Sequence, residues 1–490
     1  MTHRMKPPRA RAALILPCMV LSLLAGSAAS AQIASPDTST TLPAPAEIPS
    51  WLSQPQGAPL DRWSLAKCIA TALDKNVDAR AAHAQTVQAR GASLGAWSGI
   101  LPSLSGKLGA SRVIPDKQSS FRGFTQDSTL FGDNVPRETF ATRTEYLQAG
   151  ATLGANIISV PSWKEKNRQD HLKRGAEEGE AETRNGVVFA VKQQYFTLLK
   201  AQRLADVSRE SERLARDQEK RAEALFQVGT VARGDVLKAR ARRATTQLDR
   251  IRAENQVEIQ RSKLKQILGQ KPETPLEIEG ILLEKVVVPD SLAAVQKALK
   301  DRPELSRVLA VEDAARAGLT GARARRLPSV SASLNVDRTK IDEKVEFGGS
   351  SIDTTTSRYT TQWQGQVRLN LPFFDGFALE GNTKQAKGAV LEAEAARRQR
   401  EVDVKVEVQQ AWLTLRESLD RIGVARDGLA SAEEDYKFSK GRYDLGAGTY
   451  LDVLQSEVSL SDARRSYVEA LADAHVAEAA LERAIGERRY

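Results

Sequence analysis

The sequence predicts a mainly α-helical protein that also carries four β-strands of membrane-spanning length. Three observations lead to this prediction: long stretches without proline, four segments that alternate between apolar and polar residues, and an internal duplication. Of the 490 residues, 27% are charged, 41% are hydrophobic and only 5% are aromatic, which favours long helices over an all-β fold. The length allows several ordinary domains or one large repeated architecture.

The first 31 residues predict a secretory signal peptide. A basic segment, residues 1–11, precedes an apolar run of 14 residues and then the small residues GSAASA, so cleavage is expected before Gln32. The apolar run is short for a bilayer span, which disfavours the alternative of a membrane anchor. Cys18 lies in the middle of this run after a proline, and lipidation of Cys18 is therefore not expected.

The rest of the chain has a modest charge and a single cysteine. Residues 32–60 contain six prolines and predict an extended leader. The net charge of +9 falls to about +5 once the four basic residues of the signal peptide are removed. Lys and Arg alternate with Glu and Asp along the helical stretches, which is typical of solvated faces and does not indicate a nucleic-acid partner. Cys68 alone remains, so no intrachain disulfide is expected.

Proline-free stretches predict two long helices, each followed by a turn and a shorter helix. No proline lies between Pro161 and Pro272, and none follows Pro372. Helices of 60 to 70 residues would be on the order of 90–105 Å long, so an elongated molecule is expected. The expected long helices are Ser162–Phe226 and Phe374–Tyr443. The first turn contains Gly229, and the second contains Gly446 and Gly448. The expected shorter helices are Asp235–Leu268 and Asp452–Ile485, and the aspartate that begins each is its expected N-cap.

One segment inside the second long helix gives a conflicting signal. EVDVKVEV, residues 401–408, alternates with period two as a strand does. Both flanks are helical, and we therefore expect this segment to be helical as well.

Four segments near the prolines predict strands. They lie near residues 103–113, 145–157, 329–337 and 362–372, and three of them place a continuous set of apolar residues on one face. About ten residues suffice for a tilted strand to cross a bilayer, whereas a soluble sheet with one wet face has the same pattern. Four strands are too few to close a barrel, so a barrel would need several chains. The connecting loops are expected at residues 114–143 and 337–361.

The chain repeats itself. ALDKNVDARAA from Ala72 matches ALKDRPELSRV from Ala298, and LPSL from Leu101 matches LPSV from Leu327, both at an offset of 226. The turn phrases FQVGTVARGDVL, from Phe226, and YDLGAGTYLDVL, from Tyr443, recur at an offset of 217. Residues 61–285 and 286–490 are therefore expected to be two structural repeats of helix, strand, loop, strand, long helix, turn and helix.

These features resemble the TolC family of bacterial outer-membrane efflux proteins, also called outer membrane factors. The resemblance rests on the two turn phrases, on WSLAKCIATALDKN, on the LPSL and LPSV junctions, and on LPFFDGF after the last strand. It covers nearly all of residues 60–487 in the right order, twice. No single motif is specific, but their ordered duplication is.

The resemblance implies a homotrimer in the outer membrane of a Gram-negative bacterium. Each protomer would give four strands to a shared 12-stranded β-barrel, and the helical hairpins would form an α-barrel through the periplasm. The implied function is a passive exit duct of a tripartite efflux pump or type I secretion system. The implied partners are a periplasmic adaptor (membrane fusion) protein, an inner-membrane RND or ABC transporter, and outer-membrane lipid.

The resemblance also assigns roles at the turns, which would be the periplasmic tips. Asp452 would form a carboxylate ring in the pore, made less acidic because Gln455 replaces the second aspartate of some members. Tyr443 and Asp235 match a pair that hydrogen-bonds to close the gate, whereas Gly448 replaces an arginine that assists them. Helix capping is the alternative role of both aspartates. Residues expected at the adaptor-contacting tips are Gly229 and Gly446, as turn residues, and Val236, Leu237, Val453 and Leu454, as packing residues.

No pattern in the sequence predicts catalysis. His83, His171 and His475 have no second ligand at helical spacing, and the sequence contains no phosphate loop, nucleophile elbow or HExxH motif. Neither an enzyme, a cofactor nor a metal site is therefore expected. The alternative to a duct is a non-channel structural coiled-coil protein of the cell envelope, which would have no need for two strand pairs.

Overall fold

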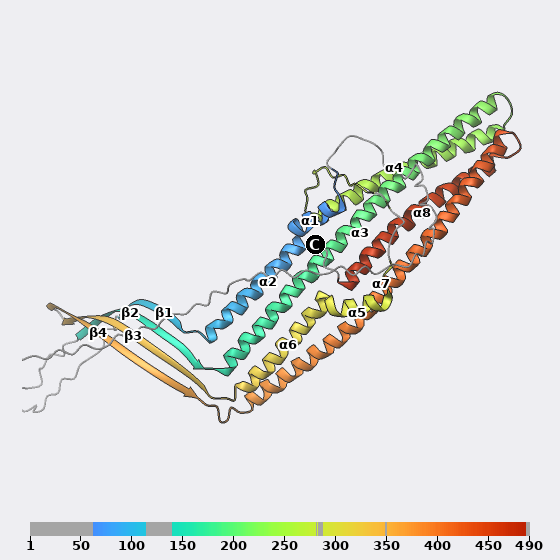
Figure 1. The fold of residues 1–490 in the computed structure, drawn as a ribbon. Helices are drawn as coiled ribbons and strands as arrows, with labels where there is room; N and C mark the ends of the chain where they lie inside the picture. The colour runs from blue at the N-terminus through green and yellow to red at the C-terminus, as the bar shows by residue number, and fades with distance from the viewer. Residues whose placement is uncertain (1–61, 114–139, 281, 283–287, 348–349, 487–490) are drawn as a thin grey trace, which may run out of the picture. The chain divides into compact units, whose positions relative to one another are not determined.

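The computed structural model describes residues 62–113, 140–280, 282, 288–347 and 350–486 (Figure 1). The predicted signal peptide and proline-rich leader, and most of the first predicted loop, lie outside the described residues.

The helices follow the duplicated order. The first half contains α1 (Leu65–Lys75), α2 (Val77–Gly95), the short 3-10 helix η2 (Ala96–Gly99), α3 (Val160–Gln227) and α4 (Arg233–Ile267). The second half contains α5 (Ser291–Asp301), α6 (Pro303–Ala324), α7 (Ala378–Asp444) and α8 (Tyr450–Ile485). At 68 and 67 residues, α3 and α7 are each about 100 Å long.

Each half begins with two short helices where the sequence analysis expected one. In the first half the break is at Asn76, whose side chain accepts hydrogen bonds from the backbone N–H groups of Asp78 and Ala79 and so caps α2. In the second half Pro303 begins α6, since proline fits the first turn of a helix but not its interior.

The start of α7 corrects a second expectation. The helix begins at Ala378 rather than at Phe374, and Phe377 precedes it with a left-handed φ of 68°. The Asp375 carboxylate accepts a hydrogen bond from the backbone N–H of Leu379 at 2.6 Å. It thereby pairs with one of the N–H groups that the first turn of a helix leaves without an intrahelical partner.

Residues 401–408 are helical, as predicted. Val404 and Val408 are fully buried, whereas Val402 and Val406 are more than half exposed. The alternating pattern therefore arises because two apolar pairs lie on different faces of one helix.

Four antiparallel strands form one sheet in the order β1-β2-β3-β4. Their bounds are β1 (Ser103–Val113), β2 (Phe140–Ile158), β3 (Ser329–Phe347) and β4 (Ser350–Asn370). The register places Leu104 opposite Leu153, Leu153 opposite Leu334, and Val336 opposite Trp363. Because residues opposite one another share a face, the predicted apolar residues of all four strands lie on one face of the sheet. A bulge near Asn156 brings Ile158 rather than Ile157 opposite Val330.

The strands are longer than predicted, and most of the predicted second loop is sheet. The β3–β4 ladder continues from the pair Asp337–Gln362 to the pair Phe347–Ser350. The residues that continue the apolar face of β3 into this extension include the charged Arg338, Lys340 and Asp342, so the extension lacks the alternation on which the prediction relied. Its threonines favour strands, and the Asp342 carboxylate joins the two strands by accepting a hydrogen bond from the Ser357 hydroxyl at 2.6 Å.

The helices pack mainly around α3, which contacts α1, α2, α4, α6 and α8. The larger core cluster includes Cys68, Val191 and Leu198. Cys68 is fully buried, and burial raises the pKa of its thiol to about 11, so the thiol is protonated at neutral pH. None of the described helices is both long enough and apolar enough to cross a membrane.

On the polar face of the sheet, an ion pair spans the second strand. Lys107 of β1 and Asp337 of β3 both lie opposite Gly150 of β2, and the Lys107 ammonium is 2.9 Å from the Asp337 carboxylate. A Cβ atom at position 150 would lie 2.1 Å from Asp337 Oδ1 and 2.8 Å from Lys107 Cε. The ion pair therefore depends on the absence of a side chain at position 150.

Replacing Gly150 with alanine should separate this ion pair and destabilise the sheet. We expect Gly150→Ala to lower the free energy of unfolding by up to about 1 kcal/mol, the usual contribution of a partly exposed ion pair, because the side-chain ends of Lys107 and Asp337 can move away from the new Cβ. The measurement is denaturant unfolding of the detergent-purified protein. Gly109→Ala is the matched control, because Gly109 lies on the same face and a Cβ there would meet nothing within 4 Å. Equal stability of the two variants would contradict the argument.

Candidate functional site

The two hairpin turns share one backbone design. In the first, the N–H of Gly229 donates to the carbonyl of Phe226 at 3.0 Å, and the N–H of Thr230 donates to Leu225 at 3.0 Å. In the second, Gly446 donates to Tyr443 at 3.0 Å, and Ala447 to Arg442 at 2.9 Å. These are Schellman motifs, which require a left-handed residue, and Gly229 and Gly446 have φ values of 77° and 71°.

The helices that follow the turns are capped differently, and neither predicted aspartate N-cap is correct. Thr449 is the N-cap of α8, and its hydroxyl accepts a hydrogen bond from the N–H of Asp452 at 3.2 Å. The Asp452 carboxylate accepts the N–H of Thr449 at 3.1 Å, completing a capping box. The N-cap of α4 is Ala232, which has no side chain able to accept a hydrogen bond, and Asp235 lies in the first turn with Lys238 at 3.4 Å.

Asp452 and Gln455 are both exposed and are three residues apart on α8, so they lie on neighbouring positions of one helix face. The hydrogen bonds that Asp452 accepts from Thr449 hold the pKa of its carboxyl below the usual range. The carboxylate therefore stays ionised at neutral and mildly acidic pH while it caps the helix. The Asp452 carboxylate can therefore cap α8 and at the same time carry a negative charge that attracts cations.

The predicted packing residues divide into two groups. Val236 and Val453 are buried and belong to the larger core cluster, with Leu454 packed against it. Leu237 is instead 55% exposed. In this chain three of the four residues pack the helices, and Leu237 lies on the open surface of the first tip.

Tyr443 lies near Asp235, but without the hydrogen bond that the resemblance implies. The Tyr443 side chain is buried, and its hydroxyl has no hydrogen-bond partner among the residues that the structure describes. Burial, and then the negative charge of Asp235, raise the pKa of Tyr443. Its ring packs edge-on against Tyr450, with 5.9 Å between ring centroids. This ring contact lies within the second hairpin, where it joins the end of α7 to the start of α8.

Gly448 fits closely against the end of α7. A Cβ atom at position 448 would lie 3.1 Å from the Cβ of Arg442 and 3.2 Å from the backbone nitrogen of Tyr443. The guanidinium of Arg442 donates to the carbonyl of Ala447 at 3.1 Å. An arginine at 448 would have to displace this arrangement, and Arg442 supplies the positive charge at the second turn.

Polar contacts between the two hairpins were not predicted from the sequence. Arg221 of α3 forms an ion pair with Asp444 of α7, and the amide of Gln218 donates to the Tyr436 hydroxyl at 3.3 Å. Tyr436 and Tyr443 are both buried and lie seven residues apart on α7. That spacing is typical of a helix-packing seam and was the available signal.

A second ion pair between the hairpins, more buried than Arg221–Asp444, joins α4 to α8. The Arg242 guanidinium lies 3.1 Å from the Glu457 carboxylate, and the two side chains are only 16% and 2% exposed. Burial raises the pKa of Glu457 although Arg242 opposes the shift. Two hairpins that are far apart in sequence are thus connected beneath both tips.

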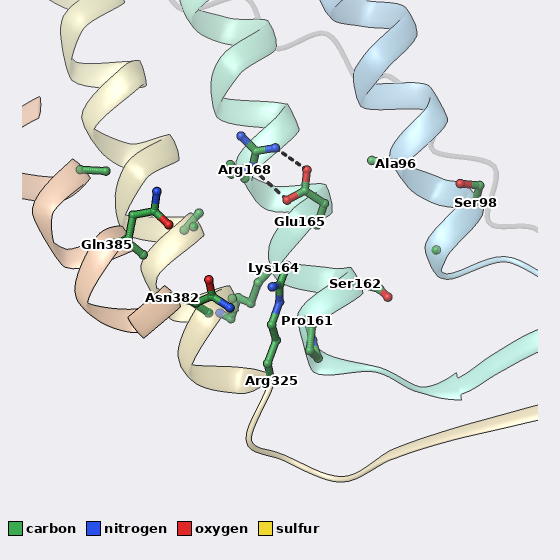
Figure 2. Close-up of a pocket in the computed structure, with 17 residues that line it drawn as sticks. Ala96, Ser98, Pro161, Ser162, Lys164, Glu165, Arg168, Arg325, Asn382 and Gln385 are labelled. Atoms are coloured by element: carbon green, nitrogen blue, oxygen red, sulfur yellow. Dashed lines mark hydrogen bonds and ion pairs between the residues drawn. The ribbon is translucent and has the colours of Figure 1, made fainter. Parts of the chain in front are cut away.

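At the other end of the helices, a cavity of about 760 Å³ lies between η2 and the ends of α3, α6 and α7 that adjoin the strands (Figure 2). Glu165 accepts two hydrogen bonds from Arg168, at 2.8 and 2.7 Å, which lower the pKa of the carboxyl. Lys164, Arg325 and the amides of Asn382 and Gln385 also line the cavity. Alanines and glycines make up much of the remaining wall. In the described part of the chain no three His, Cys, Asp or Glu residues could hold a metal ion.

Comparison with known sequences identifies the family. The family model described as "Outer membrane efflux protein" matches residues 68–270 and 294–487, that is, both repeats. The outer membrane protein TolC of Vibrio cholerae is 25% identical over 363 residues, covering 72% of this chain and 78% of that protein. Protein CyaE of Bordetella pertussis is 26% identical over 295 residues, 60% of each chain.

Comparison with solved structures gives the same fold. The CmeC outer membrane channel of Campylobacter jejuni superposes with a TM-score of 0.69 at 19% identity, covering 86% of this chain and 85% of that chain. CusC, a protein that forms a transmembrane channel, superposes with a TM-score of 0.69 at 19% identity, over 89% and 96% of the two chains. With both repeats matched by one family model and the four-stranded sheet and helical hairpins matched by these channels, the chain belongs to the outer membrane efflux protein family.

Proposed function

We propose that three copies of this chain form the exit duct of a tripartite efflux pump or type I secretion system. Family membership places the protein in the outer membrane as an efflux channel protein. The single observation that carries the finer proposal is the sheet, in which four strands share one apolar face while β1 and β4 are its two edges.

Unpaired edges are the reason for proposing a trimer. A strand edge in lipid exposes N–H and C=O groups that water cannot satisfy, at a cost of several kcal/mol for each group. The β1 edge of one copy can pair with the β4 edge of the next. Three copies would supply 12 strands and leave no edge open, and 12 strands lie within the range of membrane barrels.

The two faces of the sheet support a water-filled interior. On β4, Trp363, Val367 and Leu369 lie on the apolar face, and Gln362, Gln364 and Gln366 lie on the other. An apolar exterior suits lipid and an amide-rich interior suits water. The duct itself has no energy source, so we assign energy and cargo selection to an inner-membrane RND or ABC transporter that an adaptor protein joins to the tips.

The alternative, a structural coiled-coil protein without a channel, has no support. A coiled-coil rod buries its apolar seam between helices and has no use for a four-stranded sheet with an exposed apolar face.

The proposal is tested by fractionation and by heat-dependent migration. We expect the protein in the outer-membrane fraction, migrating as a trimer in detergent before heating and as a monomer after it. A closed barrel has no free edges through which the detergent could open it. A protein that stayed monomeric and soluble after the same extraction would overturn the proposal.

The proposed ring of Asp452 side chains predicts cation block. We expect Asp452→Ala and Asp452→Asn to raise the half-blocking concentration of a multivalent cation about tenfold, which corresponds to a loss of about 1.4 kcal/mol of attraction from the three carboxylates together. The measurement is conductance in planar bilayers. Thr449→Ala is the control, because it breaks the capping box, at a cost of about 1 kcal/mol, and keeps the carboxylate. Unchanged block in both Asp452 variants would remove this residue from the pore.

The Tyr443 hydroxyl provides a test of how the gate is held. Because this hydroxyl is buried without a hydrogen bond, we expect Tyr443→Phe to leave the closed-state conductance unchanged and to raise the free energy of unfolding by about 1 kcal/mol. Conductance in bilayers and denaturant unfolding measure the two effects. A clear rise in conductance would instead show that the hydroxyl makes a latching hydrogen bond in the assembled protein.

A further inference from the structure

On the apolar face of the sheet, charged residues begin at the end that lies away from the helices. All four strands join the helices at their other end, since β1 and β3 start, and β2 and β4 finish, next to a helix. From that end, β3 and β4 carry only apolar residues and one glycine on this face as far as Trp363 of β4. The next row places Arg338 opposite Thr361, and the row beyond it places Lys340 opposite Tyr359. This face meets lipid in the proposed barrel, so a lipid contact here rests on the proposed function.

The position of Arg338 matches one border of a membrane-spanning band. The chain from Leu371, which directly follows β4, to Thr361 is about 33 Å long at about 3.3 Å per residue, and a strand tilt of about 40° reduces this to a height of about 25 Å. That height is typical of the apolar band of a membrane barrel, which aromatic residues border on both sides. Phe373 at one border and Tyr359 at the other are 90% and 61% exposed. Arg338, opposite Thr361, therefore lies at the level of the headgroups in the leaflet away from the helices.

Among the described charged side chains at this border, only that of Arg338 has no charged partner. Lys340 pairs with Asp342 at 2.7 Å, and Arg112 pairs with Glu145 at 2.5 Å. Arg338 is exposed and makes no ion pair or hydrogen bond with the residues that the structure describes. Its N–H donors are therefore accessible to an acceptor outside the protein.

Tyr359 holds the guanidinium of Arg338 at this level. The central carbon of the guanidinium, Cζ, lies over the Tyr359 ring at 5.4 Å from its centroid, which is a cation–π distance. Such a contact uses the positive charge and leaves the N–H donors of the planar group available for hydrogen bonds. Arg338 is thus an oriented donor group at the border of the apolar band.

Apolar side chains of β1 and β2 lie at the same level. The row of Arg338 continues through Ala149 to Leu108, and the row of Lys340 continues to Leu147. Leu108 and Leu147 are 87% and 57% exposed. A lipid could place its phosphate on the guanidinium and the start of an acyl chain on these leucines. A free phosphate ion would gain nothing from the leucines, so the surface favours a lipid over the ion.

We propose that Arg338 binds the phosphate group of an anionic lipid in the outer leaflet, with an acyl chain of that lipid against Leu108 and Leu147. A guanidinium can donate two parallel hydrogen bonds to a phosphate, and these charge-assisted bonds are stronger than neutral ones. The phosphorylated glycolipid of the outer leaflet belongs to this class of ligand. Because β3 lies between β2 and β4, the copies that would pair with β1 and β4 leave Arg338 uncovered.

The experiment is native mass spectrometry of the full-length, detergent-purified protein titrated with lipid. The probe is bisphosphorylated lipid A, and phosphatidylcholine and inorganic phosphate are titrated separately at the same ionic strength. We expect saturable binding of lipid A that is at least about tenfold tighter than binding of the zwitterionic lipid. Equal affinity for the two lipids would overturn the proposal. Saturable binding of inorganic phosphate that Arg338→Gln abolishes would also overturn it, because the ligand would then be the free ion.

A matched pair of variants separates this site from general attraction of anions. We expect Arg338→Gln to weaken lipid A binding about tenfold, since it removes the charge and the paired donors. Arg358→Gln is the control, because Arg358 is also an exposed arginine of this sheet but lies on the opposite face, across from Ile341. Unchanged affinity in Arg338→Gln, or an equal loss in Arg358→Gln, would contradict the proposed site.

Heat-dependent migration of the same samples shows which proposal has failed. If the protein and both variants migrate as trimers but Arg338→Gln binds lipid A as tightly as the unaltered chain, the lipid site is wrong and the duct stands. A protein that stays monomeric and soluble would overturn the duct and the lipid site together.

Discussion

The architecture depends on one constraint: a backbone at membrane depth must satisfy all its hydrogen bonds within protein. The sheet meets this requirement along its three internal ladders, but the backbone groups on the outer edges of β1 and β4 have no partner strand within the described sheet. If two other copies close those edges, as proposed, the threefold symmetry of the barrel applies to every other part of the chain. The helices extend that symmetry by about 100 Å, so each residue at a tip would occur three times around one axis. A single carboxylate per chain then suffices to make a ring.

The helices must hold the two tips in a fixed relation for such a ring to form. Contacts between the hairpins do this near the turns, through the Arg221–Asp444 and Arg242–Glu457 ion pairs. A buried ion pair adds little net stability compared with apolar packing, but removing one partner is costly because the other charge stays buried. Arg242 and Glu457 therefore contribute mainly to the register between α4 and α8.

Repeated local patterns made the helical hairpins, the four strands and the family predictable from the sequence. Alternation identified the apolar face of the sheet because lipid-facing and water-facing residues must differ. The ends of β3 and β4 were missed because charged residues such as Arg338, Lys340 and Asp342 replace the apolar residues there, which interrupts the alternation. The N-cap of α8 was missed because Thr449 and Asp452 can both cap, and only backbone geometry separates them. Ion pairs between residues more than 200 positions apart leave no local pattern at all.

The two tips differ most in how firmly each is fixed. In the second, a capping box and the close fit of Gly448 hold the start of α8, whereas α4 begins at Ala232 without a side-chain cap. Between them lies the Tyr443 hydroxyl, a buried group whose lost hydration costs on the order of 1–3 kcal/mol. Any movement at the tips that admits water to this hydroxyl recovers that free energy. The packed arrangement of the tips is thus opposed by one of its own buried residues.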